Sequence, residues 1–162
     1  MERAHVNGAT LEYAVMGVGE PVVCIHRAFV ADTFQPLLTQ PRLTSRYWLL
    51  TYHRRGHAAS SRVSGPTSIA QRTADCQALL AHLEVEQAHV VGHSFGGAIA
   101  LQLALDTPEL VYSWALVDQI PLILVRYGPG IVVNCHSRGI ALLRTNKSRS
   151  VVGCVARDSA LR

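Results

Sequence analysis

The sequence predicts an α/β fold in which helices cover both faces of a mostly parallel β-sheet. Several short runs of apolar residues have the length of strands that are buried on both faces. Segments with helical spacing of apolar residues separate these runs, as in a parallel sheet whose strands are connected by helices. The chain of 162 residues is 49% hydrophobic and 16% charged, which is typical of a folded domain with its own core.

Five segments have the composition of strands. Residues 9–16 partly alternate between apolar and polar side chains, which predicts an edge strand. Residues 21–26 and 47–52 are almost wholly apolar and predict two buried strands. A third buried strand is predicted at residues 89–92 and a fourth at residues 111–117. The four buried strands are expected to form the centre of the sheet.

Three segments between the strands favour helices. The clearest one spans residues 69–83, where apolar residues recur at three- and four-residue spacing after Thr67 or Ser68 as the capping residue. Residues 95–105 are small and apolar, as in a helix packed against a sheet. Residues 31–38 are compatible with a short helix that an internal proline would strain.

The excess positive charge of the chain lies in its last quarter. Residues 1–118 hold eight Arg and ten Asp or Glu, whereas residues 119–162 hold seven Arg or Lys and one Asp. Hydrophobic periodicity is also lost after residue 118. We therefore divide the chain into a core at residues 1–118 and a basic segment at residues 119–162. We hypothesise a truncation or a shifted reading frame after about residue 118. The basic segment lacks interleaved aromatic residues and any nucleic-acid motif, so we expect neither nucleic acid nor membrane as a partner.

The run Gly92-His93-Ser94-Phe95-Gly96-Gly97 is the motif that indicates chemistry. It follows a predicted strand and opens a predicted helix, which is the setting of a G-x-S-x-G nucleophile elbow. Because the chain reverses tightly there, we expect Ser94 to be strained, and Gly92 and Gly96 to avoid collisions across the turn. Ser94 Oγ would then lie at the carboxyl edge of the sheet, where open α/β sheets bind ligands. The alternative, in which Ser94 is only a helix cap, fits these flanks less well.

Through this motif the chain resembles the α/β-hydrolase superfamily, and two further segments support the resemblance. The strand that ends at His26 stands where the family reads His-Gly before an oxyanion-hole residue. Residues 52–60, Tyr-His-Arg-Arg-Gly-His-Ala-Ala-Ser, resemble the family's Asp-x-Arg-Gly-x-Gly-x-Ser loop. With their flanking strands and helices, the three features cover about residues 9–118.

The resemblance implies roles for five residues. Ser94 would be the nucleophile, and the backbone N–H groups of Phe95 and Ala28 would form the oxyanion hole. His26 would brace the loop that carries Ala28, and His93 would be a side chain of the elbow rather than the catalytic base.

Two departures from the family pattern matter for the site. Arg27 stands where the family has Gly, and it would be strained if the backbone required a positive φ. His53 stands where the family usually has Asp, so any ion pair of that Asp with a neighbouring Arg would be lost. His53 and His57 have the spacing of metal ligands on one helix, but Gly56 argues for a loop, and we predict no metal site.

The remaining members of a Ser–acid–His triad are harder to assign. The family orders them along the chain as Ser, acid, His. Asp118 ends a predicted strand after the elbow, which is an acid position that the family sometimes uses; it is equally compatible with a plain strand end. His136 is the one histidine after Ser94, but its surroundings do not resemble the family's histidine loop.

These features predict a hydrolase that attacks an ester or related acyl substrate through an acyl-enzyme. The alternative is an impaired fragment or pseudo-enzyme without the acid and histidine of the triad. We expect a small-molecule substrate, a cytoplasmic location and possible homo-oligomers formed through an exposed sheet edge. No cofactor is predicted, because the sequence lacks a dinucleotide fingerprint and a phosphate-binding loop.

Overall fold

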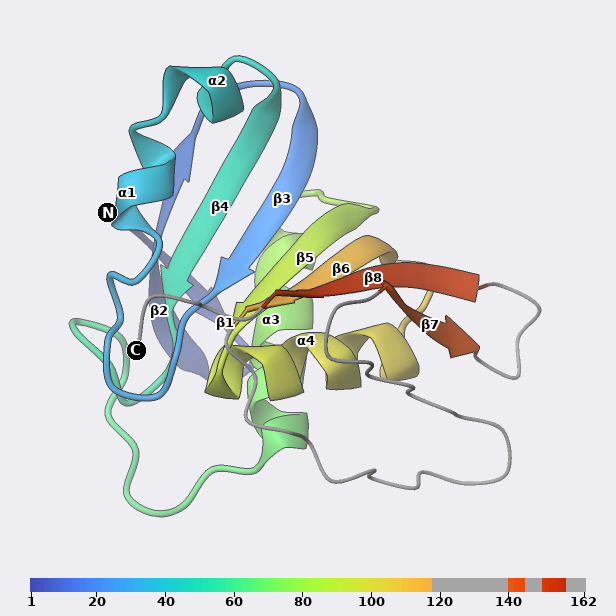
Figure 1. The fold of residues 1–162 in the computed structure, drawn as a ribbon. Helices are drawn as coiled ribbons and strands as arrows, with labels where there is room; N and C mark the ends of the chain where they lie inside the picture. Colours follow the sequence, from blue (N-terminus) through green and yellow to red (C-terminus); the bar gives the residue numbers. More distant parts are fainter. Residues whose placement is uncertain (118–139, 145–149, 157–162) are drawn as a thin grey trace, which may run out of the picture.

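The strands of the protein form one sheet in the order β1-β2-β4-β3-β5-β6-β8-β7 (Figure 1). The computed structural model describes residues 1–117, 140–144 and 150–156. Neighbouring strands pair in parallel from β4 through β3, β5 and β6 to β8, so the predicted α/β fold with a mostly parallel sheet is confirmed. The strands are β1 (Glu2–Val6), β2 (Ala9–Met16), β3 (Glu20–Ile25), β4 (Tyr47–His53), β5 (Ala88–His93), β6 (Val111–Val117), β7 (Ile140–Arg144) and β8 (Ser150–Ala156).

The strand at residues 9–16 does not lie at the edge of the sheet, so that prediction is wrong. This strand, β2, pairs antiparallel with β4 on one side and with β1 on the other. A two-residue turn joins β1 to β2, and both of its residues, Asn7 and Gly8, have positive φ values of 48° and 70°. That is the geometry that Asn-Gly favours in a tight hairpin. Within the described residues, β1 and β7 are the outermost strands. Association through a sheet edge stays a prediction.

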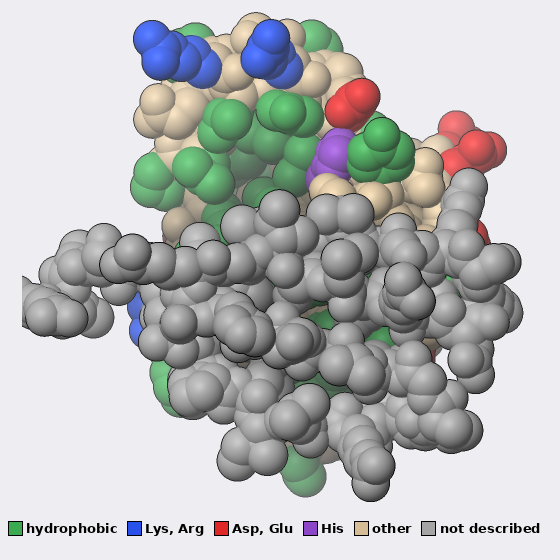
Figure 2. All heavy atoms as spheres, turned by 45° about the vertical axis from the view of Figure 1, so that its right-hand side comes forward, with side chains coloured by type: hydrophobic (Ala, Val, Ile, Leu, Met, Phe, Trp, Pro, Cys, Tyr) green, Lys and Arg blue, Asp and Glu red, His purple; other side chains and the backbone are tan. Residues whose placement is uncertain are grey.

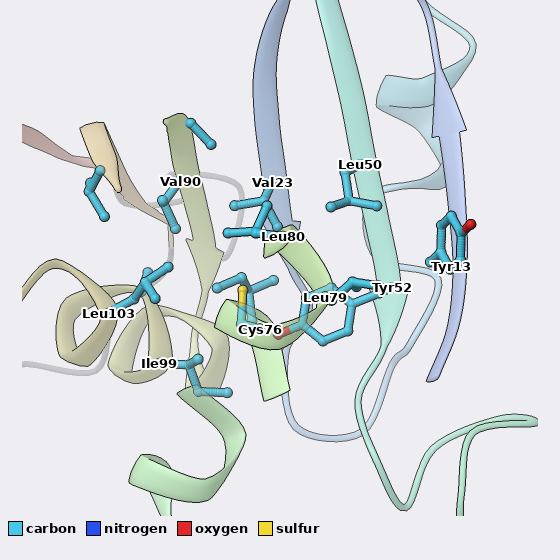
Figure 3. Close-up of a cluster of buried hydrophobic side chains, with 14 of the residues drawn as sticks. Tyr13, Val23, Leu50, Tyr52, Cys76, Leu79, Leu80, Val90, Ile99 and Leu103 are labelled. Carbon is cyan, nitrogen blue, oxygen red and sulfur yellow. The ribbon is translucent and has the colours of Figure 1, made fainter. Parts of the chain in front are cut away.

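The larger core lies between the sheet and two helices on one face, α3 (Ile69–His82) and α4 (Phe95–Asp106). Side chains of β3, β4 and β5 meet those of both helices there, as the labelled residues of Figure 3 show. Ser68 caps α3, since its Oγ accepts a hydrogen bond of 3.1 Å from the Gln71 N–H. Burial in this core raises the pKa of the Cys76 thiol to about 12.

The opposite face of the sheet carries a smaller core under two short helices, α1 (Gln35–Leu38) and α2 (Pro41–Thr44). Helices therefore cover both faces, as predicted. Only the last turn of the expected helix at residues 31–38 is helical. Pro36 lies in its first turn, where a missing N–H costs no helical hydrogen bond, so it causes no strain. The buried residues of this core are Val22, Cys24, Phe34, Leu38 and Leu49.

The surface combines charged side chains with several large apolar ones. Figure 2 shows hydrophobic side chains gathered on part of one face, with acidic and basic side chains around them. Among the residues whose burial is described, Phe29 has the most exposed large apolar side chain, at 95%. Within the described residues, no helix has the length and apolar character needed to cross a membrane.

Candidate active site

Ser94 occupies a sharp bend between β5, which ends at His93, and α4, which begins at Phe95. Its backbone has φ 51° and ψ −114°, a conformation that side-chain-bearing residues rarely adopt. Two backbone hydrogen bonds of 2.9 Å hold the bend: the Ser94 N–H donates to the Val117 carbonyl, and the Gly97 N–H donates to the Ser94 carbonyl. Ser94 is half-buried, so the bend leaves it partly accessible at the carboxyl end of β5.

Gly92 and Gly96 allow this bend for two different reasons. A Cβ on Gly92 would lie 2.6 Å from the Gly96 carbonyl oxygen, within the turn itself. A Cβ on Gly96 would overlap the carbonyl oxygen of Ile25 and lie 2.7 Å from that of His26. Ile25 ends β3 and His26 follows it, so the start of α4 packs directly on the segment that leads to Ala28. The two predicted oxyanion-hole residues therefore lie on adjoining segments.

His26 is fully buried and ties the segment after β3 to the loop after β4. Its Nδ1 lies 2.7 Å from the Arg27 carbonyl oxygen, to which it donates. Its Nε2 accepts a hydrogen bond of 3.1 Å from the Arg54 N–H. Burial, helped by the charge of Arg54, lowers the pKa of His26 to about 3. The imidazole is therefore neutral, as this pair of hydrogen bonds requires.

Ala28 and Phe95 each have a contact that restrains them. The Ala28 carbonyl accepts a hydrogen bond of 2.6 Å from Nε2 of His57, which joins the segment after β3 to the loop after β4. The Phe95 ring lies beneath two guanidinium groups, at 4.9 Å from Arg54 and 5.5 Å from Arg72. No group of three potential metal-ligating side chains is present among the described residues.

The departures from the family pattern have local solutions. Arg27 does not have a positive φ, so the strain considered for it does not arise. The strained position is instead Ala58, with φ 45°, where the family loop reads Gly. His53 stands between two carboxylates: its Nδ1 lies 2.9 Å from Glu12 Oε2 and its Nε2 lies 3.1 Å from Asp32 Oδ1.

An ion pair that sequence reasoning missed joins the same loop to α3. The guanidinium of Arg55 forms two hydrogen bonds with the buried carboxylate of Asp75. Asn7 also donates to this carboxylate, at 2.7 Å. The arginine of the loop therefore has a carboxylate partner, although His53 has replaced the expected Asp. The sequence offered one signal, an acidic residue on the apolar side of the predicted helix.

A second serine–histidine–acid group lies at the opposite end of the parallel strands. His89 Nδ1 is 2.7 Å from Ser113 Oγ, and its Nε2 is 3.2 Å from Glu20 Oε2. His89 and Glu20 line a hollow of about 230 Å³. Ser113 lies within β6, which pairs with β5 and β8, so the sheet occupies the backbone N–H groups that an oxyanion hole would require. This group resembles a triad in contacts but lacks the bend found at Ser94.

Of three further predicted residues, the structure describes only His93. The His93 ring meets the Phe34 ring edge to face, with centroids 6.4 Å apart, so it packs over the smaller core. Asp118 and His136 lie outside the described residues. Their roles as acid and base stay predictions.

The comparisons with known proteins support the fold. The chain is 35% identical over 117 residues to the dihydrolipoyllysine-residue acetyltransferase component of the acetoin cleaving system of Cupriavidus necator, covering 72% of this chain and 31% of that protein. It is 34% identical over 119 residues to a putative carbamate hydrolase of Azorhizobium caulinodans, covering 73% and 44%. The crystal structure of the enol-lactonase from Burkholderia xenovorans LB400 superposes with a TM-score of 0.68 at 27% identity, covering 73% and 46%.

The chain thus spans less than half the length of each of these relatives. A family model described as alpha/beta hydrolase fold matches residues 21–130, which include the elbow and both loops beside it. This match shows that the chain belongs to the α/β-hydrolase fold family.

Proposed function

We propose that the protein is a serine hydrolase in which Ser94 attacks the carbonyl carbon of an ester or related acyl substrate. The observation that supports this most strongly is the bend at Ser94, with its positive φ and its two flanking glycines. A helix cap needs none of these features, because capping residues adopt ordinary extended backbone conformations. Ser68, which does cap a helix, has φ −74° and ψ 161°.

In this mechanism the chain supplies an oxyanion hole around the attacked carbonyl. Attack by Ser94 Oγ moves negative charge to the substrate oxygen, which the N–H groups of Phe95 and Ala28 would stabilise. The N-terminus of α4 adds a favourable dipole at the same place. Loss of the leaving group gives an acyl-enzyme, which water hydrolyses. A base must accept the Ser94 proton; by the chain order of the family this base would be His136, oriented by Asp118.

The proposed substrates are compounds with a carbonyl carbon that a serine can attack. The named relatives include an acetyltransferase component and a putative carbamate hydrolase, and both names refer to groups that react at such a carbon. Because the chain covers only 31% and 44% of these proteins, the impaired fragment or pseudo-enzyme is the alternative to be tested.

A burst experiment separates the two functions. An active serine should release about one p-nitrophenol per chain rapidly from p-nitrophenyl acetate, followed by a slower steady rate. Ser94→Ala should abolish the burst, whereas Ser113→Ala should keep it. Folded protein that releases p-nitrophenol no faster than buffer would favour the fragment.

A further inference from the structure

Arg54 is a cation enclosed beside the predicted oxyanion hole. It is only 2% exposed, and burial lowers its pKa to about 10. No carboxylate in the described part of the chain forms an ion pair with it. Burying an unpaired charge costs free energy, so the hydrogen bonds of Arg54 must offset part of that cost.

The main partner of Arg54 is the carbonyl of Arg27. Nη2 of Arg54 donates to this oxygen at 2.8 Å, and Nδ1 of His26 donates to it at 2.7 Å. A carbonyl oxygen accepts two hydrogen bonds with its two lone pairs. Both positions are therefore filled, one of them by a charged donor, and such bonds are stronger than neutral ones.

This carbonyl belongs to the same peptide group as the Ala28 N–H. The described chain contains no cis peptide bond, so the C=O and N–H of this planar group point in opposite directions. Fixing the Arg27 oxygen thus fixes the direction of the Ala28 N–H. Hydrogen bonding to the oxygen also polarises the peptide and makes its N–H a better donor.

Arg54 also contacts the residue that carries the other donor. Its guanidinium lies 4.9 Å from the centroid of the Phe95 ring, within the range of a cation–π interaction. One side chain thus contacts both Phe95 and the peptide that contains the Ala28 N–H. Arg72 lies over the same ring at 5.5 Å, but it donates to the Arg55 carbonyl and not to the Arg27 peptide.

We propose that Arg54 is a positioning residue that orients and polarises the oxyanion hole of Ser94. This inference rests on the proposed function, because it assigns Arg54 to the stabilisation of negative charge during attack by the serine. Arg54 acts through the peptide between Arg27 and Ala28 and through the Phe95 ring, without touching the substrate.

Labelling of the full chain with a fluorophosphonate tests the proposal. The reaction forms a bond between Ser94 Oγ and phosphorus, expels fluoride, and places negative charge on the phosphoryl oxygen in the transition state. Arg54→Gln should lower the maximal labelling rate about 10-fold or more, against the 10²–10³-fold that loss of an oxyanion donor costs. The concentration for half-maximal rate should change little. Arg72→Gln is the matched comparison, with an expected loss of less than about 3-fold, since it leaves the Arg27 peptide intact.

The outcomes separate this inference from the proposed function. If wild type is labelled and Arg54→Gln has the same maximal rate, the role of Arg54 is overturned but the proposed function is not. Equal losses in Arg54→Gln and Arg72→Gln would overturn the argument from the peptide. Folded wild type without labelling would overturn the proposed function and this inference together. If Arg54→Gln does not fold, Arg54→Lys decides: it keeps the charge but puts a single nitrogen in place of the guanidinium that contacts both the Arg27 carbonyl and the Phe95 ring, so a lowered maximal rate supports the proposal and an unchanged rate contradicts it.

Discussion

Gly96→Ala tests whether the elbow is built against the end of β3. The new Cβ would overlap the Ile25 carbonyl oxygen and lie 2.7 Å from the His26 carbonyl oxygen. β3 is paired with β4 and with β5, so its backbone has little freedom to move away. Overpacking of a core costs about 1–3 kcal/mol, and we expect the upper end, about 3 kcal/mol, because backbone atoms are involved on both sides.

Urea unfolding followed by circular dichroism measures this cost as a change in the free energy of unfolding. Gly65→Ala is the matched control: its Cβ would meet nothing within 4 Å, and its φ is not positive. That variant should have unchanged or slightly higher stability, by up to about 1 kcal/mol, because alanine restricts the unfolded chain. A difference below about 1 kcal/mol between the two variants would refute the packing of the elbow on β3.

Three further changes probe the elbow, the ion pair and the carboxylate beside His53. Ser94→Gly should be more stable to urea than Ser94→Ala by about 1 kcal/mol, since glycine relieves the positive φ; equal stabilities would argue against strain. Asp75→Asn should lower the free energy of unfolding by about 2 kcal/mol, because it leaves the half-buried Arg55 guanidinium without its carboxylate partner; Asp106→Asn, on the surface, should change it little, and equal effects would contradict the ion pair. The hydrogen bond from His53 holds the pKa of Glu12 below its ordinary value of 4.5. The ionised Glu12 should therefore stabilise the fold fully above pH 4.5, and this stabilisation should be lost as the pH falls through the lowered pKa of Glu12. The difference in free energy of unfolding between wild type and Glu12→Gln should shrink on acidification; a constant difference from pH 3 to 7 would contradict the lowered pKa.

The fold was predictable where local pattern and environment agree. The four apolar runs became the parallel strands β3, β4, β5 and β6, because strands buried on both faces need apolar residues at every position. The hairpin before them was missed, since β1 is short and mostly polar. The Asn7-Gly8 turn was the available signal, as this dipeptide favours positive φ at both turn positions.

The candidate site was predictable only in part. The bend at Ser94 is marked by six consecutive residues, so a local motif was enough to find it, although the Ser94 N–H also bonds to the distant Val117 carbonyl. The carboxylate partners of His53 and Arg55 lie 20 to 41 residues away in the sequence. No local pattern specifies such pairs, because they depend on how strands and loops meet in the fold. The role inferred for Arg54 needed the same long-range information, since it depends on a contact 27 residues away.

Mapping the fluorophosphonate adduct on the full chain by tandem mass spectrometry tests the central claim most directly. An accessible and activated hydroxyl at the bend predicts one phosphonyl group per chain, located on Ser94 and absent from Ser94→Ala. Folded protein that carries no adduct, or carries it on Ser113 beside His89, would contradict the assignment of Ser94 as the nucleophile.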